Sequence, residues 1–109
     1  MALGYLAIFL VRLAGAGWAD AETVDVEGRG AVDLKPFVCQ DITRSSLVNR
    51  VCYDAANRTM IVQLNSVYSL YCGVPEAARD SFLNAPSMGQ YYNANIKGSG
   101  AAAPYQCRP

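Results

Sequence analysis

The residues that could perform chemistry are few in this 109-residue sequence. Histidine is absent, which excludes Ser-His-Asp and Cys-His catalytic sites and any zinc site that needs imidazole. Between residues 44 and 98 the only acids are Asp54, Glu76 and Asp80. Asp54 suits a turn, and the other two fit an exposed helix face, so we see no general acid–base pair. The sequence therefore predicts a protein that is not an enzyme, with no catalytic residue, metal site or cofactor.

Arginine and tyrosine side chains are the main candidates for binding. Arg50, Arg58, Tyr68 and Tyr71 lie in or beside predicted strands, and aromatic rings beside cations on a sheet can stack on bases. Nine Lys and Arg residues balance nine Asp and Glu residues, whereas a chain that neutralises several phosphates usually carries a basic excess. We therefore favour a non-enzymatic module that binds an unidentified protein or small ligand. Binding to RNA or single-stranded nucleic acid is the alternative.

A second candidate surface lies in the segment APSMGQYYNANIKG, residues 85–98. Ser87 followed by Gln90 fits a capping box, and Gly98 fits the position after a helix end. Four residues recur at helical spacing and are predicted to pack on a sheet: Met88, Tyr91, Tyr92 and Ile96. The amides Gln90, Asn93 and Asn95 then remain on the outer side, and we take Gln90 and Asn93 as further binding candidates.

Three strands and two helices must position these residues. Residues 47–53, 58–64 and 67–72 are predicted strands, separated by a turn over residues 54–57 and a two-residue turn over 65–66. A helix begins near Pro75 and stops before Pro86, and a second helix runs over residues 87–97. The predicted fold is α+β: a small three-stranded antiparallel meander followed by two short helices packed on one face of the sheet.

The predicted strand register divides the meander into two faces. Pairing across the 65–66 turn places one set of mainly apolar residues on the face that we expect the helices to cover: Leu47, Val51, Tyr53, Met60, Val62, Leu64, Val67 and Tyr71. The opposite face carries Cys52, Ile61, Tyr68 and Leu70 among more polar residues. This second face is mixed and needs at least partial cover.

The four cysteines are predicted to form two disulfides, because so small a domain has a limited core. In the predicted register, Cys52 on the first strand and Cys72 on the third strand lie on either side of Thr59 in the middle strand. Neighbouring strands are about 4.8 Å apart, so the two cysteines are separated by about 9.5 Å. A disulfide needs Cα atoms within about 7 Å, so this pair is disfavoured. Two pairings remain: Cys39–Cys52 with Cys72–Cys107, and Cys39–Cys72 with Cys52–Cys107. We favour the first, because short loops close more easily.

The first 21 residues are typical of a signal peptide. An apolar run of ten residues, Ala2 to Val11, is too short to span a bilayer, and Ala19-Asp20-Ala21 fits a cleavage site. A buried N-terminal helix or an uncleaved anchor is the alternative. We predict a signal peptide at 1–21, an N-terminal arm at 22–43, a domain at 44–98 and a C-terminal tail at 99–109. The arm and the tail are each expected to be tethered by a disulfide. The mature protein is expected to be a monomer without a stable membrane span, in the periplasm or secreted.

Residues 45–98 resemble the KTSC domain, a family named for the C-terminus of some lysyl-tRNA synthetases. The resemblance rests on SSLVNRVCYD, RTMIVQL, YCGVP and APSMGQYYNANIKG, and S-x-G-x-Y-[YF]-N within the last segment is the most specific motif. Cys52 stands where the family pattern has a glycine, and Ser69 stands where it has the first tyrosine of Y-x-Y.

With its leader and four cysteines, the chain looks like the short secreted KTSC proteins of alphaproteobacteria. The family has no established activity, so the resemblance implies the α+β fold but no reaction. The synthetase context suggests RNA binding, which we discount here because a periplasmic protein would seldom meet tRNA.

Overall fold

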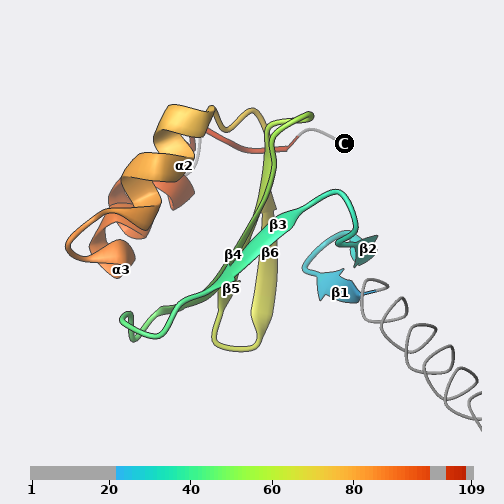
Figure 1. Cartoon of the computed structure of the whole chain (residues 1–109), viewed down its shortest axis with the longest axis horizontal. Coiled ribbons are helices and arrows are strands. Elements are labelled where there is room, and N and C mark those ends of the chain that lie inside the picture. Colours follow the sequence, from blue (N-terminus) through green and yellow to red (C-terminus); the bar gives the residue numbers. More distant parts are fainter. Residues whose placement is uncertain (1–21, 99–102, 108–109) are drawn as a thin grey trace, which may run out of the picture.

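The computed structural model describes residues 22–98 and 103–107, and its framework is a six-stranded sheet (Figure 1). The strands are β1 (Thr23–Val26), β2 (Gly30–Asp33), β3 (Val38–Asp41), β4 (Val48–Asp54), β5 (Thr59–Leu64) and β6 (Val67–Tyr71), in the spatial order β2-β1-β6-β5-β4-β3. The helices are α2 (Glu76–Leu83), α3 (Met88–Tyr91) and the π-helix η1 (Tyr92–Lys97). The predicted signal peptide lies outside the described residues. Within the described part of the chain, no helix is long and apolar enough to cross a membrane.

The predicted meander is confirmed as β4–β5–β6, three antiparallel neighbours in the sheet. The register between β5 and β6 is also the predicted one, with Met60 opposite Tyr71 and Leu64 opposite Val67. The predicted register between β4 and β5 is wrong, because Cys52 lies opposite Ile61 instead of Thr59. Asn65 has a φ of 58°, as a two-residue hairpin turn requires. Val67 is 42% exposed rather than part of the core, because it borders this turn at the end of the sheet.

The helices cover one face of the meander, here called the helix face. Phe82 of α2 is fully buried there, together with Met88, Tyr92 and Ile96 from the second helical segment. That segment begins as predicted, since the Ser87 side chain accepts a hydrogen bond from the Gln90 backbone N–H at 3.3 Å. Its second half is π-helical instead of α-helical.

The predicted three-stranded sheet is wrong in extent, because the N-terminal arm adds strands to the meander. Residues 23–41 form three strands. β1 and β2 make an antiparallel hairpin that joins β6 through one parallel pair, Val26 with Tyr68. β3 pairs antiparallel with β4 and places Cys39 opposite Cys52. Strands of four residues carry too little periodicity to predict with confidence from sequence, and they gain stability only from neighbours in the folded sheet.

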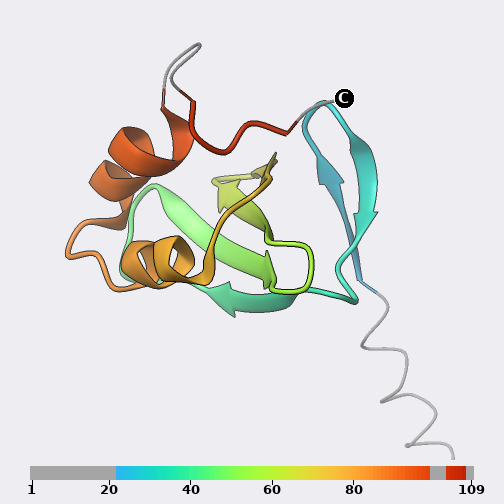
Figure 2. The same ribbon diagram turned by 90° about the horizontal axis from the view of Figure 1, so that it is seen from above.

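The β1–β2 hairpin lies on the other side of the meander from the helices, here called the hairpin face (Figures 1 and 2). Val24, Val26 and Leu34 form a small second core there with Cys52 and Ile61. This core supplies the cover that the mixed face of the meander needs.

The two disulfides are Cys39–Cys52 and Cys72–Cys107, the pairing that was favoured because short loops close more easily. Their Cα atoms are 3.9 Å and 4.9 Å apart. The second bond places the C-terminal tail beside the end of β6, where the Cys72 N–H also donates to the Tyr105 carbonyl at 2.9 Å. The described parts of the N-terminal arm and of the tail are thus fixed to the sheet.

Candidate functional site

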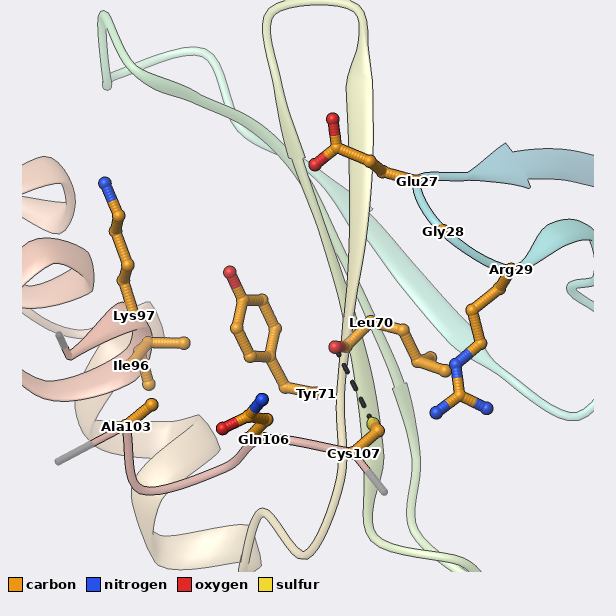
Figure 3. A pocket seen from close by; sticks show the side chains of 10 residues that line it. All are labelled: Glu27, Gly28, Arg29, Leu70, Tyr71, Ile96, Lys97, Ala103, Gln106 and Cys107. Atoms are coloured by element: carbon orange, nitrogen blue, oxygen red, sulfur yellow. Dashed lines mark hydrogen bonds between the residues drawn. The ribbon is translucent and has the colours of Figure 1, made fainter. Parts of the chain in front are cut away.

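A cleft of about 700 Å³ opens where four segments of the chain meet (Figure 3). The β1–β2 turn, the end of β6, the end of η1 and the tail supply its lining: Glu27, Gly28, Arg29, Leu70, Tyr71, Ile96, Lys97, Ala103, Gln106 and Cys107. This volume is in the range of sites that bind small molecules. Among residues 22–98 and 103–107, no group of three His, Cys, Asp or Glu residues could hold a metal ion.

The position of the β1–β2 turn follows from two local features. Gly28 and Gly30 have φ values of 77° and 85°, a left-handed conformation that glycine adopts without steric cost. The Glu27 N–H donates to the Tyr68 carbonyl at 2.9 Å and so ties the start of the turn to β6. The turn therefore forms one wall of the cleft instead of extending into solvent.

Tyr71 places a phenol between the walls of the cleft. Its hydroxyl hydrogen-bonds the Tyr92 hydroxyl, and the two rings meet edge to face with centroids 6.0 Å apart. Burial raises the pKa of the Tyr71 phenol, and the Tyr92 hydroxyl and the Glu27 carboxylate raise it further. The phenol therefore stays neutral across the physiological range and acts as a hydrogen-bonding group.

Opposite charges stand on the two walls of the cleft. The Glu27 carboxylate projects from the hairpin side and the Lys97 ammonium from the η1 side, with the Tyr71 hydroxyl between them (Figure 3). Both residues are exposed. Neither takes part in an ion pair with any described residue. Both charges are thus available to a ligand.

Of the four predicted nucleic-acid residues, the structure brings together only Arg50 and Tyr68, whose side chains interact across Gln63 of β5. Tyr71 packs into the core of the helix face, whereas Tyr68 packs on the hairpin face. Arg58 lies in the exposed β4–β5 turn with a φ of 53°, at the other end of β5 from the position paired with Tyr68. No single face of the sheet therefore presents both tyrosines beside the arginines.

Arg50 already has acidic partners within the chain. Its guanidinium donates two hydrogen bonds to the Glu22 carboxylate at 2.7 Å and 2.9 Å, and its Nε lies 3.5 Å from Asp41 Oδ1. The Glu22 carboxylate raises the pKa of Arg50, and the Arg50 guanidinium lowers the pKa of Glu22. This ion pair ties the start of β1 to β4, so the role that the structure gives Arg50 is structural.

The amides Gln90 and Asn93 are exposed, as predicted. Gln90 borders a shallow hollow of about 350 Å³ between the α2–α3 connection and the second helical segment. Tyr91 also lines this hollow, with its ring stacked on Phe82 at a centroid distance of 5.8 Å. The hollow is half the volume of the cleft at β6 and has no charged residue in its lining.

Sequence reasoning missed most of the cleft. Tyr71 was a binding candidate, but Glu27, Lys97 and Gln106 were not. The glycines at 28 and 30 did indicate a turn, yet nothing in the sequence places that turn beside β6. The signal that could have found Gln106 is the Cys72–Cys107 pairing, which brings the tail to the end of β6.

Comparisons with known proteins agree on one domain. The family profile described as KTSC domain matches residues 44–99. The crystal structure of a KTSC domain protein from Yersinia pestis is similar, with 32% sequence identity and a TM-score of 0.56, over 66% of this chain and 94% of that chain. No curated protein matches the chain significantly.

The matched region explains how the cleft is assembled. Leu70, Tyr71, Ile96 and Lys97 lie inside residues 44–99, whereas residues 27–29 and 103–107 lie outside. Each disulfide also joins one cysteine inside this region to one outside it. The cleft is therefore formed jointly by the common domain and by two segments that flank it.

Proposed function

This chain belongs to the KTSC domain family, and from this premise we propose that it is a non-enzymatic, disulfide-stabilised module that binds a small ligand in the cleft at β6. One observation carries the proposal: on walls that the flanking segments help to build, the cleft places a neutral phenol and two opposite charges, Glu27 and Lys97, that form no ion pair with a described residue. A pre-formed concave site with a few converging polar groups is the usual form of a ligand site.

Binding is favoured over catalysis by the chemistry of these groups. A general acid or base works best with a pKa near the operating pH. The pKa of Tyr71 is shifted away from that range, so its phenol is suited to hydrogen bonding. Glu27 and Lys97 stand on opposite walls rather than as a hydrogen-bonded pair.

We further propose that the protein is exported, as the short secreted type within the family. Two disulfides are consistent with a periplasmic or extracellular location. N-terminal sequencing of the native protein should then find Glu22 first, in the periplasm or medium. A native protein that keeps Met1 and stays in the cytoplasm would contradict export.

The cleft can be tested by filling it. Gln106 is exposed and faces the cleft (Figure 3), so Gln106→Trp should block the site without disturbing either core. Gln40→Trp, on exposed β3, is the matched control. Saturation-transfer difference NMR on the small-molecule fraction of a periplasmic extract should show bound compounds for the wild type and Gln40→Trp, and lose them for Gln106→Trp. Identical spectra for all three proteins would reject the cleft as a binding site.

RNA binding is the alternative function. Arg50 and Tyr68 interact on the hairpin face, but Tyr71 on the helix face and Arg58 at the other end of β5 do not join them, which argues against a shared nucleic-acid surface. The full chain should not be retained on immobilised single-stranded RNA at low salt. Retention that weakens as salt is raised would instead support the alternative, because release of counterions makes nucleic-acid binding salt-dependent.

A further inference from the structure

β6 has a gap in its backbone hydrogen bonding at Leu70. The two-residue turn makes Leu64 and Val67 the closing hydrogen-bonded pair, and pairs along an antiparallel hairpin alternate. Leu70, three residues past Val67 and opposite Ile61, therefore directs its N–H and C=O away from β5. These groups point to the outer edge of β6.

The outer edge is occupied on both sides of this gap. The Tyr68 carbonyl accepts from the Glu27 N–H, and the Cys72 N–H donates to the Tyr105 carbonyl, both at 2.9 Å. Between these two contacts, the backbone of Leu70 has no backbone partner among the described residues. Four residue steps separate positions 68 and 72, which corresponds to about 13 Å of strand.

The tail leaves the Leu70 carbonyl available as an acceptor. Cys107 Sγ lies 3.7 Å from it (Figure 3). That sulfur is bonded to Cys72 and carries no proton, so it cannot donate a hydrogen bond. Both Leu70 and Cys107 line the cleft, and the gap in the edge of β6 therefore opens into it.

We propose that the cleft binds a dipeptide-sized zwitterion whose peptide group pairs with the backbone of Leu70. This inference rests on the proposed binding role of the cleft and adds the ligand class. One peptide unit offers the N–H and C=O that complement an open strand edge. The ligand's ammonium faces Glu27 and its carboxylate faces Lys97, two charges of the cleft that form no ion pair with a described residue.

The size and polarity of the cleft select a short ligand. An extended dipeptide spans about 7 Å and fits within the gap, whereas a longer strand would meet β1 on one side and the tail on the other. Ile96 and Ala103 give the cleft an apolar wall, which favours an apolar side chain on the ligand.

The test uses the full chain, purified with both disulfides formed, and four matched ligands. The reference ligand is L-alanyl-L-leucine. N-acetylation removes its ammonium, amidation removes its carboxylate, and N-methylation of the peptide bond removes its N–H. NMR titration should show the reference ligand moving the Leu70 amide signal and binding about fivefold more tightly than each modified ligand, as partly exposed charge pairs and single hydrogen bonds predict.

Charge-neutral variants assign each end of the ligand. Lys97→Gln should abolish the preference for the free carboxylate and keep the preference for the free ammonium, and Glu27→Gln should do the reverse. Lys35→Gln and Asp25→Asn change exposed charges outside the cleft and should preserve both preferences. The proposal would be overturned if the protein bound all four ligands with equal affinity. It would also be overturned if the control variants lost the same preferences for the free ammonium or the free carboxylate.

The two proposals fail in different ways. If no dipeptide shifts the Leu70 signal but compounds of the extract still bind in a manner that Gln106→Trp abolishes, the ligand class is wrong and the cleft remains a binding site. If Gln106→Trp changes nothing with either the extract or the dipeptides, the binding role of the cleft is wrong as well.

Discussion

The two faces of the β4–β5–β6 meander are covered in different ways. Among the described residues, ten are buried in the core of the helix face; they come from the sheet, from both helical segments and, with Val74, from the connection between β6 and α2. Five of the described residues are buried in the core of the hairpin face, and two of these belong to the meander. Because hydrophobic stabilisation scales with the apolar area buried, the helix face can be held by packing, whereas the hairpin face needs additional ties.

Those additional ties are present on the hairpin face. β1 and β6 share a single backbone pair. The Cys39–Cys52 disulfide fixes β3 to β4, and the Arg50–Glu22 ion pair fixes the residue before β1 to β4. Covalent and ionic cross-links thus extend a small core onto a second face of the meander, and the cleft forms at the border of that extension.

The largest expected effect is on the helix face. Phe82 is fully buried and its ring lies near those of Tyr91 and Tyr92. Phe82→Ala should lower the free energy of unfolding by about 3–5 kcal/mol, because it removes apolar contacts and leaves a cavity. Denaturant unfolding of the oxidised protein measures it.

Phe37→Ala is the matched substitution on the hairpin face. Phe37 is only half-buried against the second core, so the same truncation should cost clearly less. An equal loss of stability in the two variants would show that the faces contribute alike, and the comparison would fail.

On the hairpin face, the largest effect should come from the Cys39–Cys52 disulfide. Replacing both cysteines by alanine should destabilise the protein by about 3 kcal/mol, the value expected for a closed loop of this size. Hydrogen exchange should accelerate most in β1–β3 and least in β5, since the helix face keeps its own packing.

The Cys72–Cys107 pair provides the control for this experiment. Its removal should release the tail and leave exchange in β1–β3 unchanged. If both disulfide variants accelerate exchange in β5 and in β1 to the same extent, the two faces unfold as one unit and the hairpin face has no separate dependence on its disulfide.

The same contrast explains what could be predicted from sequence. The helix face follows from local patterns: the turn at Asn65, the cap at Ser87 and the helical spacing of Met88, Tyr92 and Ile96 all agree with the structure. The hairpin face depends on contacts between residues distant in sequence, such as Val26 with Tyr68. Four-residue strands do not specify their partners, so the arm could not be placed.

The cleft was hard to predict for a related reason. Two of its charged residues, Glu27 and Lys97, are exposed and lie far apart in the sequence, and each alone has the character of ordinary surface charge. Only the strand order, which sets β1 beside β6, places them on opposite walls. The disulfide pairing was the one long-range constraint that the sequence did supply, and it places the tail correctly.

A smaller effect should come from the helix cap. Ser87→Ala removes the acceptor of the Gln90 N–H and should cost about 0.5–2 kcal/mol, as losses of N-cap residues do. Since the capped helix covers the helix face alone, hydrogen exchange in β1 and β2 should stay unchanged. A variant that unfolds like the wild type would show that Ser87 contributes nothing as a cap.

Lowering the pH should have the smallest effect on stability, and it should weaken the hairpin face alone. Because Arg50 lowers the pKa of Glu22 in the folded protein below its usual value of about 4.5, the ion pair stabilises the fold fully above that pH, and this contribution is lost as the pH falls through the lowered pKa. Glu22 is exposed, so the loss should be slight. Amide exchange near Thr23–Val26, corrected for the intrinsic effect of pH and compared with β5, should therefore show extra opening only below about pH 4.5. Glu22→Gln should show that opening already at neutral pH and no further change with acid; a Glu22→Gln protein that keeps the wild-type acid response would assign the effect to another group.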